Sequence, residues 1–370
     1  MSRRLAGRAA AVALVPAAAA TSGAAETASS SVVWRLELSS DRHCDAAPLA
    51  ALDGRGWSAV APRAGRNLAY LDDSVALVRD DADSGWGWSL LARSHLDVVA
   101  SDGALALARQ ATSGQAAAAD TRWAVQVHYA GFVGAGLEVR RRWAPSGGWT
   151  LTPSLQVLRL SRWRERSAAG LVTFQAAAQR YTAQVDTLQV YDGLALPYQQ
   201  APAAYGLGLL PGLALAHQRN DGWFGSLVLR DGGWLRWPGI PRQTLSLQTD
   251  RQTTDADGFL VYGPLIEGQN SQQPASGRRA WRTTLVAGRA LAGGQSWSAV
   301  LDHRPGFGLL PTVQWQRQGG AVEWGAEWRL HERRLTGTLA WHGLKLRLGA
   351  DRLGRSSHSR EVALAWSTGF

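Results

Sequence analysis

Cysteine is almost absent from this sequence. Cys44 is the single cysteine among 370 residues, so an internal disulfide is excluded. The fold must therefore be stabilised by packing or by contact with lipid. The residues before Cys44 read "DRH" and form no lipobox, so we do not interpret Cys44 as a lipidated residue.

Long apolar runs and lysine are also scarce. No stretch beyond the N-terminal region contains 18 consecutive apolar residues, which excludes a conventional transmembrane helix. Lys345 is the only lysine, and all other basic side chains except histidine are arginine. The base composition of the genome is the simpler explanation of that bias, and a need for bidentate anion contacts is the alternative.

The N-terminal region has the pattern of a secretory signal peptide. Three arginines precede an apolar run at residues 9–20, and small residues follow it. The run is too short and too rich in alanine to span a bilayer as a helix. We expect residues 1–25 to be a signal peptide cleaved after Ala20 or Ala25. No linker or internal repeat divides residues 26–370, which we expect to form one domain.

Apolar and polar residues alternate in short segments almost everywhere after residue 30. In residues 321–332, for example, Trp324 and Trp328 lie on one face, and Glu323 and Glu327 lie on the other. A period of two over eight to twelve residues is typical of half-exposed strands. Tight glycine-containing turns alternate with longer links, as in antiparallel sheets whose two ends differ.

Some segments are harder to interpret. Residues 120–143 keep one parity and fit either one long strand or two strands with a glycine-rich bend. Residues 101–114 fit a strand or a short capped helix. We expect loops or insertions near 40–66, 192–204 and 251–279.

The last nine residues, "VALAWSTGF", continue the alternation to the end of the sequence. Val362, Leu364 and Trp366 stand two apart, and Phe370 is the last residue. This pattern resembles the C-terminal signature of Gram-negative outer-membrane β-barrel proteins, although Thr368 departs from it. The resemblance implies that the barrel-assembly machinery recognises Val362, Leu364, Trp366 and Phe370, and that the last strand then pairs with the first.

Alternating strands would also fit a soluble sandwich. Tryptophans near strand ends, export without disulfides and the C-terminal pattern favour a membrane barrel instead. A sheet edge exposed to lipid leaves N–H and C=O groups unpaired, so the sheet must close. We therefore expect an all-β fold: a closed antiparallel transmembrane β-barrel of about 14–16 strands, within a range of 12–18. Both termini should lie at the rim that carries the tight turns.

The resemblance implies an integral protein of the cell outer membrane, and we expect a channel or transporter-like pore. Its expected partners are outer-membrane lipid, lipopolysaccharide and the barrel-assembly machinery, and nucleic acid is not expected despite the basic pI. The most informative polar residues are the candidates for lumen or anion contacts: Arg140, Arg142, Arg162, Arg164, Arg329, Lys345 and Arg347. Such residues favour anionic solutes if they line the lumen, bind lipopolysaccharide phosphates if they face the outer leaflet, or are solvated strand ends.

No strong catalytic motif is present. The eight histidines are scattered without metal-ligand spacing, so we expect neither a metal nor a cofactor. His331 and His342 are interpreted as lumen-lining side chains. The stretch "SSHSR" at 356–360 and the acidic pairs at 72–73 and 80–81 leave an outer-membrane hydrolase of lipid or peptide as an alternative. A structural or assembly barrel that serves a partner is the other alternative.

Overall fold

The structure is a computed structural model, and two of the sequence predictions lie outside the part that it describes. These are the signal peptide at residues 1–25 and the terminal Phe370. Among the described residues, no helix is both long and apolar enough to cross a membrane. The described residues are 32–51, 60–114, 116–194, 203–249, 252–254, 260–262 and 265–369.

Strands dominate the described chain, with one α-helix, α1 (Asp102–Ser113), and one short 3-10 helix, η1 (Leu49–Ala51). The strands are β1 (Val32–Cys44), β2 (Arg66–Asp81), β3 (Trp86–Ser101), β4 (Thr121–Arg141), β5 (Trp149–Gln175), β6 (Arg180–Tyr191), β7 (Gly206–Gln218), β8 (Trp223–Arg230), β9 (Gly233–Gln248), β10 (Gln252–Thr254), β11 (Leu260–Tyr262), β12 (Ile266–Arg279), β13 (Arg282–Leu291), β14 (Gln295–Arg304), β15 (Gly308–Gly319), β16 (Val322–Arg329), β17 (Arg334–Trp341), β18 (Leu344–Ala350) and β19 (Ser359–Gly369).

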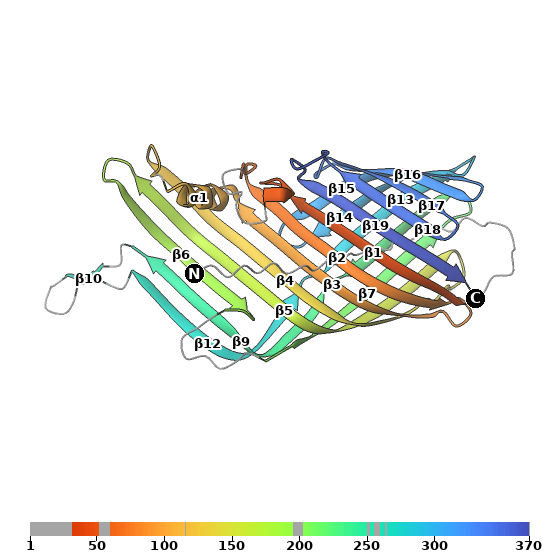
Figure 1. The fold of residues 1–370 in the computed structure, drawn as a ribbon, viewed down its shortest axis with the longest axis horizontal. Helices are drawn as coiled ribbons and strands as arrows, with labels where there is room; N and C mark the ends of the chain where they lie inside the picture. The colour runs from red at the N-terminus through yellow and green to blue at the C-terminus, as the bar shows by residue number, and fades with distance from the viewer. Residues whose placement is uncertain are drawn as a thin grey trace.

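The strands form a closed antiparallel β-barrel (Figure 1). Ladders connect β1 to β5 in order, then β7, β8 and β13, and then β14 to β19 in order. The last strand returns to the first, with Val33 opposite Gly369 and His43 opposite Ser359. The sheet has 17 strands, of which β6, β9 and β12 lie outside this circuit, so the circuit contains 17 − 3 = 14 strands. The predicted fold class is confirmed.

Three strands, β6, β9 and β12, extend the wall beyond the closed circuit. β6 pairs with residues 164–175 of β5, and β7 pairs with residues 149–160 of β5. β6 and β7 therefore lie end to end beside β5, with a break between Tyr191 and Gly206. β9 continues the line of β8, and it pairs with β6 and β12. In Figure 1 the β9–β12 pair projects from the barrel body at the lower left. The structure thus has a tall side and a short side.

The strand β12 corrects one sequence prediction. Residues 266–279 were expected to belong to a long loop, but they form a strand that pairs with β9. Both faces of β12 are largely exposed. Ala275 packs against the interior apolar cluster, but most of both faces is exposed, so apolar residues do not alternate along β12 and the sequence shows no strand pattern.

Two ambiguous segments are resolved by the structure. Residues 120–143 contain one long strand, β4, and residues 101–114 contain the helix α1. The Ser101 hydroxyl caps α1 by accepting a hydrogen bond from the Ala104 N–H at 3.1 Å. Gly114 ends the helix in the left-handed region, with φ +67°. The loop expected from residue 40 begins only at Asp45, where β1 has ended.

The two faces of the wall differ as predicted. On β16, Trp328 is 53% exposed on the outer face, whereas its neighbour Glu327 is 5% exposed on the inner face. Arg329 and Arg347 also point inward, since both form ion pairs with Glu327. An apolar outer face and a charged inner face characterise a barrel that has lipid outside.

Apolar side chains pack in two places on the tall side. One cluster lies inside the barrel: Phe132, Leu158, Leu160, Trp163, Val190, Leu210, Leu235, Trp237 and Ile240. The other lies on the outer face, where α1 covers the upper end of β4: Ala104, Trp123, Val125, Val172, Phe174 and Val185. Trp123 and Val125 share their parity with the outward Leu137 and Val139. That part of the outer face is therefore shielded by the helix.

The first and last described residues, Val32 and Gly369, lie at the rim that carries the tight turns. The pair of Val33 and Gly369 closes the β1–β19 ladder at this rim. The turns at 342–343 and 320–321 lie there too, because Leu344 pairs with Trp366 and Val322 pairs with Trp341. The opposite rim carries α1, the described residues 45–51 and 60–65, and the link 351–358.

Candidate functional site: an ion-paired layer across the barrel

The site contains a buried histidine that lies between two carboxylates. His95 on β3 stands directly opposite Asp72 on β2. Its Nε2 lies 2.7 Å from Asp97, and its Nδ1 is hydrogen-bonded to Asp72. The His95 side chain is 1% exposed. The imidazole thus lies between two carboxylates, and these three side chains form a hydrogen-bonded group inside the barrel.

Two arginines reach this group from the far wall. Arg282 on β13 places Nη1 2.9 Å from Asp72 and Nη2 2.6 Å from Asp302. Arg304 on β14 places Nη1 2.9 Å from Asp97 and Nη2 3.3 Å from Asp72. Counted around the barrel from β2, β13 is the sixth strand in one direction and the eighth in the other. The two strands therefore lie almost opposite each other. Side chains therefore bridge the lumen at this level.

Tyr70 joins this group to a second one. Arg304 lies 3.5 Å above the centre of the Tyr70 ring, and the Tyr70 hydroxyl donates to Glu332 at 2.8 Å. Arg329 contacts Asp41 at 2.9 Å. Contacts between β2, β14, β16 and β1 thus continue across the barrel interior.

The second group is tightly paired. Asp41 and Glu361 face each other across the β1–β19 ladder, and Arg334 bridges them at 2.6 and 2.9 Å. Arg347 completes the group with contacts of 2.8 Å to Glu327 and 2.9 Å to Glu361. Each positive charge in this group has at least one carboxylate in contact.

A third bridge borders a cavity. Arg93 on β3 contacts Asp231, between β8 and β9, at 2.7 Å. Beside it is a cavity of about 160 Å³. Its lining combines charged and apolar side chains, including His95, Asp97, Trp163, Asp231, Arg279 and Arg282. The bridging side chains and this cavity together are called the ion-paired layer below.

The outer face of the barrel is rich in apolar side chains. It carries exposed tryptophan and leucine side chains, among them Trp234, Trp297, Leu339, Leu348 and Trp366. Such a continuous apolar surface is unfavourable in water and favourable in lipid. The chain is a β-barrel of the outer-membrane class.

Comparison with known proteins does not narrow the class to a family. No protein-family model matches the chain, and no curated protein matches it. The toluene transporter TodX of P. putida has a TM-score of 0.31 and 8% identity, covering 93% of this chain and 91% of TodX. The TodX monoaromatic hydrocarbon channel deltaS2 mutant has a TM-score of 0.29 and 10% identity, covering 92% of this chain and 89% of the mutant. The β domain of the Bordetella autotransporter Brka has a TM-score of 0.23 and 10% identity, covering 92% of this chain and 100% of the β domain.

Four of the predicted lumen residues face inward, and each has an acidic partner. Arg140 contacts Asp80 at 2.7 Å, and Lys345 contacts Glu323 at 3.5 Å. Arg329 and Arg347 belong to the ion-paired layer, as described above.

The other three lie elsewhere. Arg162 and Arg164 share the outer face of β5, because they pair with Val133 and Gly131, which have the parity of the outward β4 residues. Arg142 lies in the exposed turn after β4, at the rim of the tight turns. Among the residues proposed for assembly recognition, Val362 and Trp366 are exposed on the outer face of β19.

The sequence analysis missed the main members of the ion-paired layer. Asp72 was noted only in an acidic pair, and His95, Arg282 and Arg304 were not singled out. Their signal was present as charged residues at inward positions of strands, but nothing in the sequence shows which inward positions meet across a lumen. That depends on the closure of the sheet.

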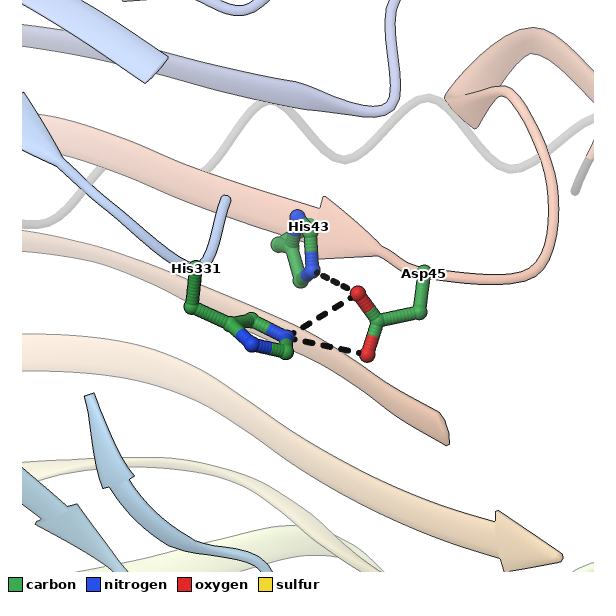
Figure 2. Close-up of side chains that lie close together, drawn as sticks. All are labelled: His43, Asp45 and His331. Carbon is green, nitrogen blue, oxygen red and sulfur yellow. Dashed lines mark hydrogen bonds and ion pairs between the residues drawn. The ribbon is translucent and has the colours of Figure 1, made fainter. Parts of the chain in front are cut away.

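A cluster of two histidines and one carboxylate also escaped the sequence analysis (Figure 2). His43 and His331 both place Nε2 3.0 Å from Asp45 Oδ1. This donor set resembles that of zinc sites. However, Arg63 Nη1 lies 2.6 Å from the same oxygen, and the Leu68 N–H donates to the other oxygen at 2.8 Å. A guanidinium at that distance opposes a cation, so we assign the cluster as an anchor for the described residues 45–51 and 60–65.

The pKa values of Asp45 in this anchor and of Glu332 nearby are both lowered. Burial alone would raise the pKa of Asp45, but hydrogen bonds from His331 and His43 outweigh it and hold this pKa well below its usual range. Burial likewise opposes ionisation of Glu332, in the turn between β16 and β17. The charges of Arg329 and Arg334 nevertheless lower the pKa of Glu332 below its ordinary value.

The stretch "SSHSR" does not have the geometry of a catalytic pair. The Ser357 hydroxyl donates to Asp351 at 2.9 Å, whereas His358 Nδ1 lies 2.9 Å from the carbonyl of Cys44. The Ser357 hydroxyl is therefore directed to Asp351 and not to His358, and the serine–histidine hydrogen bond of a catalytic pair is not formed within this described stretch.

Proposed function

We propose that this protein is an integral barrel of the cell outer membrane that acts as a narrow channel or transporter for small polar solutes. In this proposal the ion-paired layer controls passage. The observation that carries it is the bridge from Asp72 to Arg282 and Arg304, because these side chains join nearly opposite walls next to a cavity. The proposal includes export through the signal peptide and assembly by the barrel-assembly machinery.

Ionic side chains suit a gate better than an apolar plug does. When an ion pair separates inside a polar lumen, water or a charged solute can solvate both partners. The cavity adjoining the layer is lined by both signs of charge, including Asp97, Glu165, Asp231, Arg279 and Arg282. A small solute that carries both donors and acceptors matches this lining.

The preference of the channel for anions is expected to be small. Arg140, Arg329, Lys345 and Arg347 face the lumen, but every one of them contacts a carboxylate. Paired charges leave little net field to bias permeation. We therefore expect a small anion preference at low salt that disappears when the Debye length falls to about 3 Å at 1 M salt.

Planar-bilayer recording tests the gate. The Asp72→Asn, Arg282→Gln double variant removes one charge of each sign and keeps the side-chain sizes. We expect small or intermittent conductance for the unmodified protein and a larger, steadier conductance for the double variant. The matched control is Arg219→Gln, Asp221→Asn, which removes a pair at the rim, 2.9 Å apart, and should change nothing.

The outcomes separate this function from the alternatives. Equal conductance of the double variant and the unmodified protein would show that the layer does not control passage. Absence of conductance in both would favour a structural or assembly barrel. The reversal potential under a salt gradient measures the ion preference in the same recording.

A further inference from the structure

A row of four arginines lies on the outer face of β5: Arg159, Arg162, Arg164 and Arg166. We propose that this arginine row binds the phosphate groups of lipopolysaccharide in the outer leaflet. The inference is independent of whether the barrel conducts. It rests on the direction, level, charge balance and aromatic setting of these residues.

A β-bulge gives the four residues a common direction. The β4–β5 register shifts between Val133 and Gly134, so that Ser161 is the extra residue on β5. Without the shift, Arg159 and Arg162 would point to opposite faces. With it, all four arginines pair with odd-numbered β4 residues, the set that includes the outward Leu137 and Val139.

The row marks a boundary on the outer face. On one side of it, Leu155 and Val157 of β5 are each 44% exposed and belong to the apolar belt. On the other side, Val172 and Phe174 are buried beneath α1. Lipid contact therefore ends between these two zones. A lipid headgroup, with its phosphate, lies where an apolar belt ends.

The charges of the row are uncompensated. Within the described chain, none of the four guanidinium groups forms an ion pair with a carboxylate, unlike the arginines of the ion-paired layer. The intervening Glu165 points to the inner face, where it lines the cavity. Several like charges within eight residues repel one another unless an anion lies among them.

Aromatic rings hold the guanidinium planes in place. Arg159 lies 4.4 Å from the Tyr205 ring centre, and Arg164 lies 4.1 Å from that of Tyr191. Cation–π contacts use the faces of a guanidinium and leave its N–H edge available. That edge matches the oxygens of a phosphate in bidentate geometry. In addition, the Nε atoms of Arg164 and Arg166 are buried without a hydrogen-bond partner.

Native mass spectrometry of the folded, detergent-purified full chain tests the inference. The probes are lipopolysaccharide with its lipid A phosphates and the same lipid after dephosphorylation. The Arg162→Gln, Arg164→Gln variant is compared with Arg141→Gln, Arg289→Gln. Arg141 and Arg289 also stand against tryptophan rings, those of Trp86 and Trp223, but near the opposite rim.

We expect the unmodified protein and the control variant to retain the phosphorylated lipid, and the row variant to lose affinity by about tenfold or more. Dephosphorylation of the lipid should weaken binding to the unmodified protein by a similar factor. Equal retention by both variants, or equal binding of the dephosphorylated lipid, would overturn the inference. Heat-modifiable migration on gels verifies that each variant is folded before the comparison.

Discussion

At the scale of single residues, Asp45 links acidity to local structure. Its pKa is depressed in the fold, so its carboxylate stabilises the folded anchor above its unfolded pKa of about 3.9. This contribution is lost as the pH falls further, through the folded pKa. We expect the protection factor of the Ala61 backbone N–H, which is bonded to the Ala46 carbonyl, to fall below about pH 4.

Hydrogen exchange followed by mass spectrometry measures this effect. The protection factor of this amide in the Asp45→Asn variant should be low at every pH, because the variant has no carboxylate to protonate. Asp221→Asn, at the opposite rim, is the control and should leave the exchange of residues 60–65 unchanged. An acid-independent anchor in the unmodified protein would contradict the assignment.

The two faces of β18 give a second prediction for single residues. Leu346 pairs with Leu339 and Leu364 on the outer face, near the middle of a short strand. Leu346→Arg should cost about 2–4 kcal/mol if this level lies at the bilayer midplane. Glu323→Leu on the inner face should cost less than about 1 kcal/mol, since its pair with Lys345 is partly exposed.

Urea unfolding in lipid bilayers compares these two variants directly. If both substitutions proved equally harmless, the outer face of β18 would not be in lipid. A large cost for Glu323→Leu would instead mean that its pair with Lys345 is more important than its exposure indicates.

At the scale of elements, α1 depends on its cap. The Ser101 hydroxyl accepts from the Ala104 N–H and donates to the Ala124 carbonyl on β4 at 2.7 Å. Ser101→Ala should therefore destabilise the helix by about 1 kcal/mol. Faster amide exchange within Asp102–Ser113 is the expected result.

Thr112→Ala is the matched control for the cap. Its hydroxyl bonds only to the Ala108 carbonyl near the end of the same helix. The control should leave amide exchange in the first turn unchanged. Similar exchange in both variants would show that packing on Trp123 and Val125, and not the cap, holds α1 on the barrel.

At the scale of the whole molecule, the two rims define an orientation. We expect the rim of α1 and the link 351–358 to face outward and the tight turns to face the periplasm. A membrane-impermeant maleimide should label Leu353→Cys in intact cells and should not label Asp221→Cys, both in a Cys44→Ala background. Leu353 is 94% exposed, whereas Ser357 in the same link is buried and is unsuitable for labelling. The reverse labelling pattern would invert the topology.

The sequence by itself determined the class of fold. Alternation with a period of two identifies the strands, since the side chains of one strand must face lipid on one side and a polar interior on the other. The same constraint explains why Glu327 and Arg347 lie on the inner face. It also explains the failure at β12, where most of both faces is exposed and the alternation is absent.

Tertiary structure alone decided which inward residues meet. Asp72 and Arg282 are 210 positions apart in the sequence, and their contact depends on how the closed sheet brings β2 near β13. Likewise, the direction of Arg162 and Arg164 depends on one bulged residue, because a shift of one position reverses every side chain on a strand. Local pattern therefore fixes strands and their faces, whereas closure and register fix the charged contacts from which function is inferred.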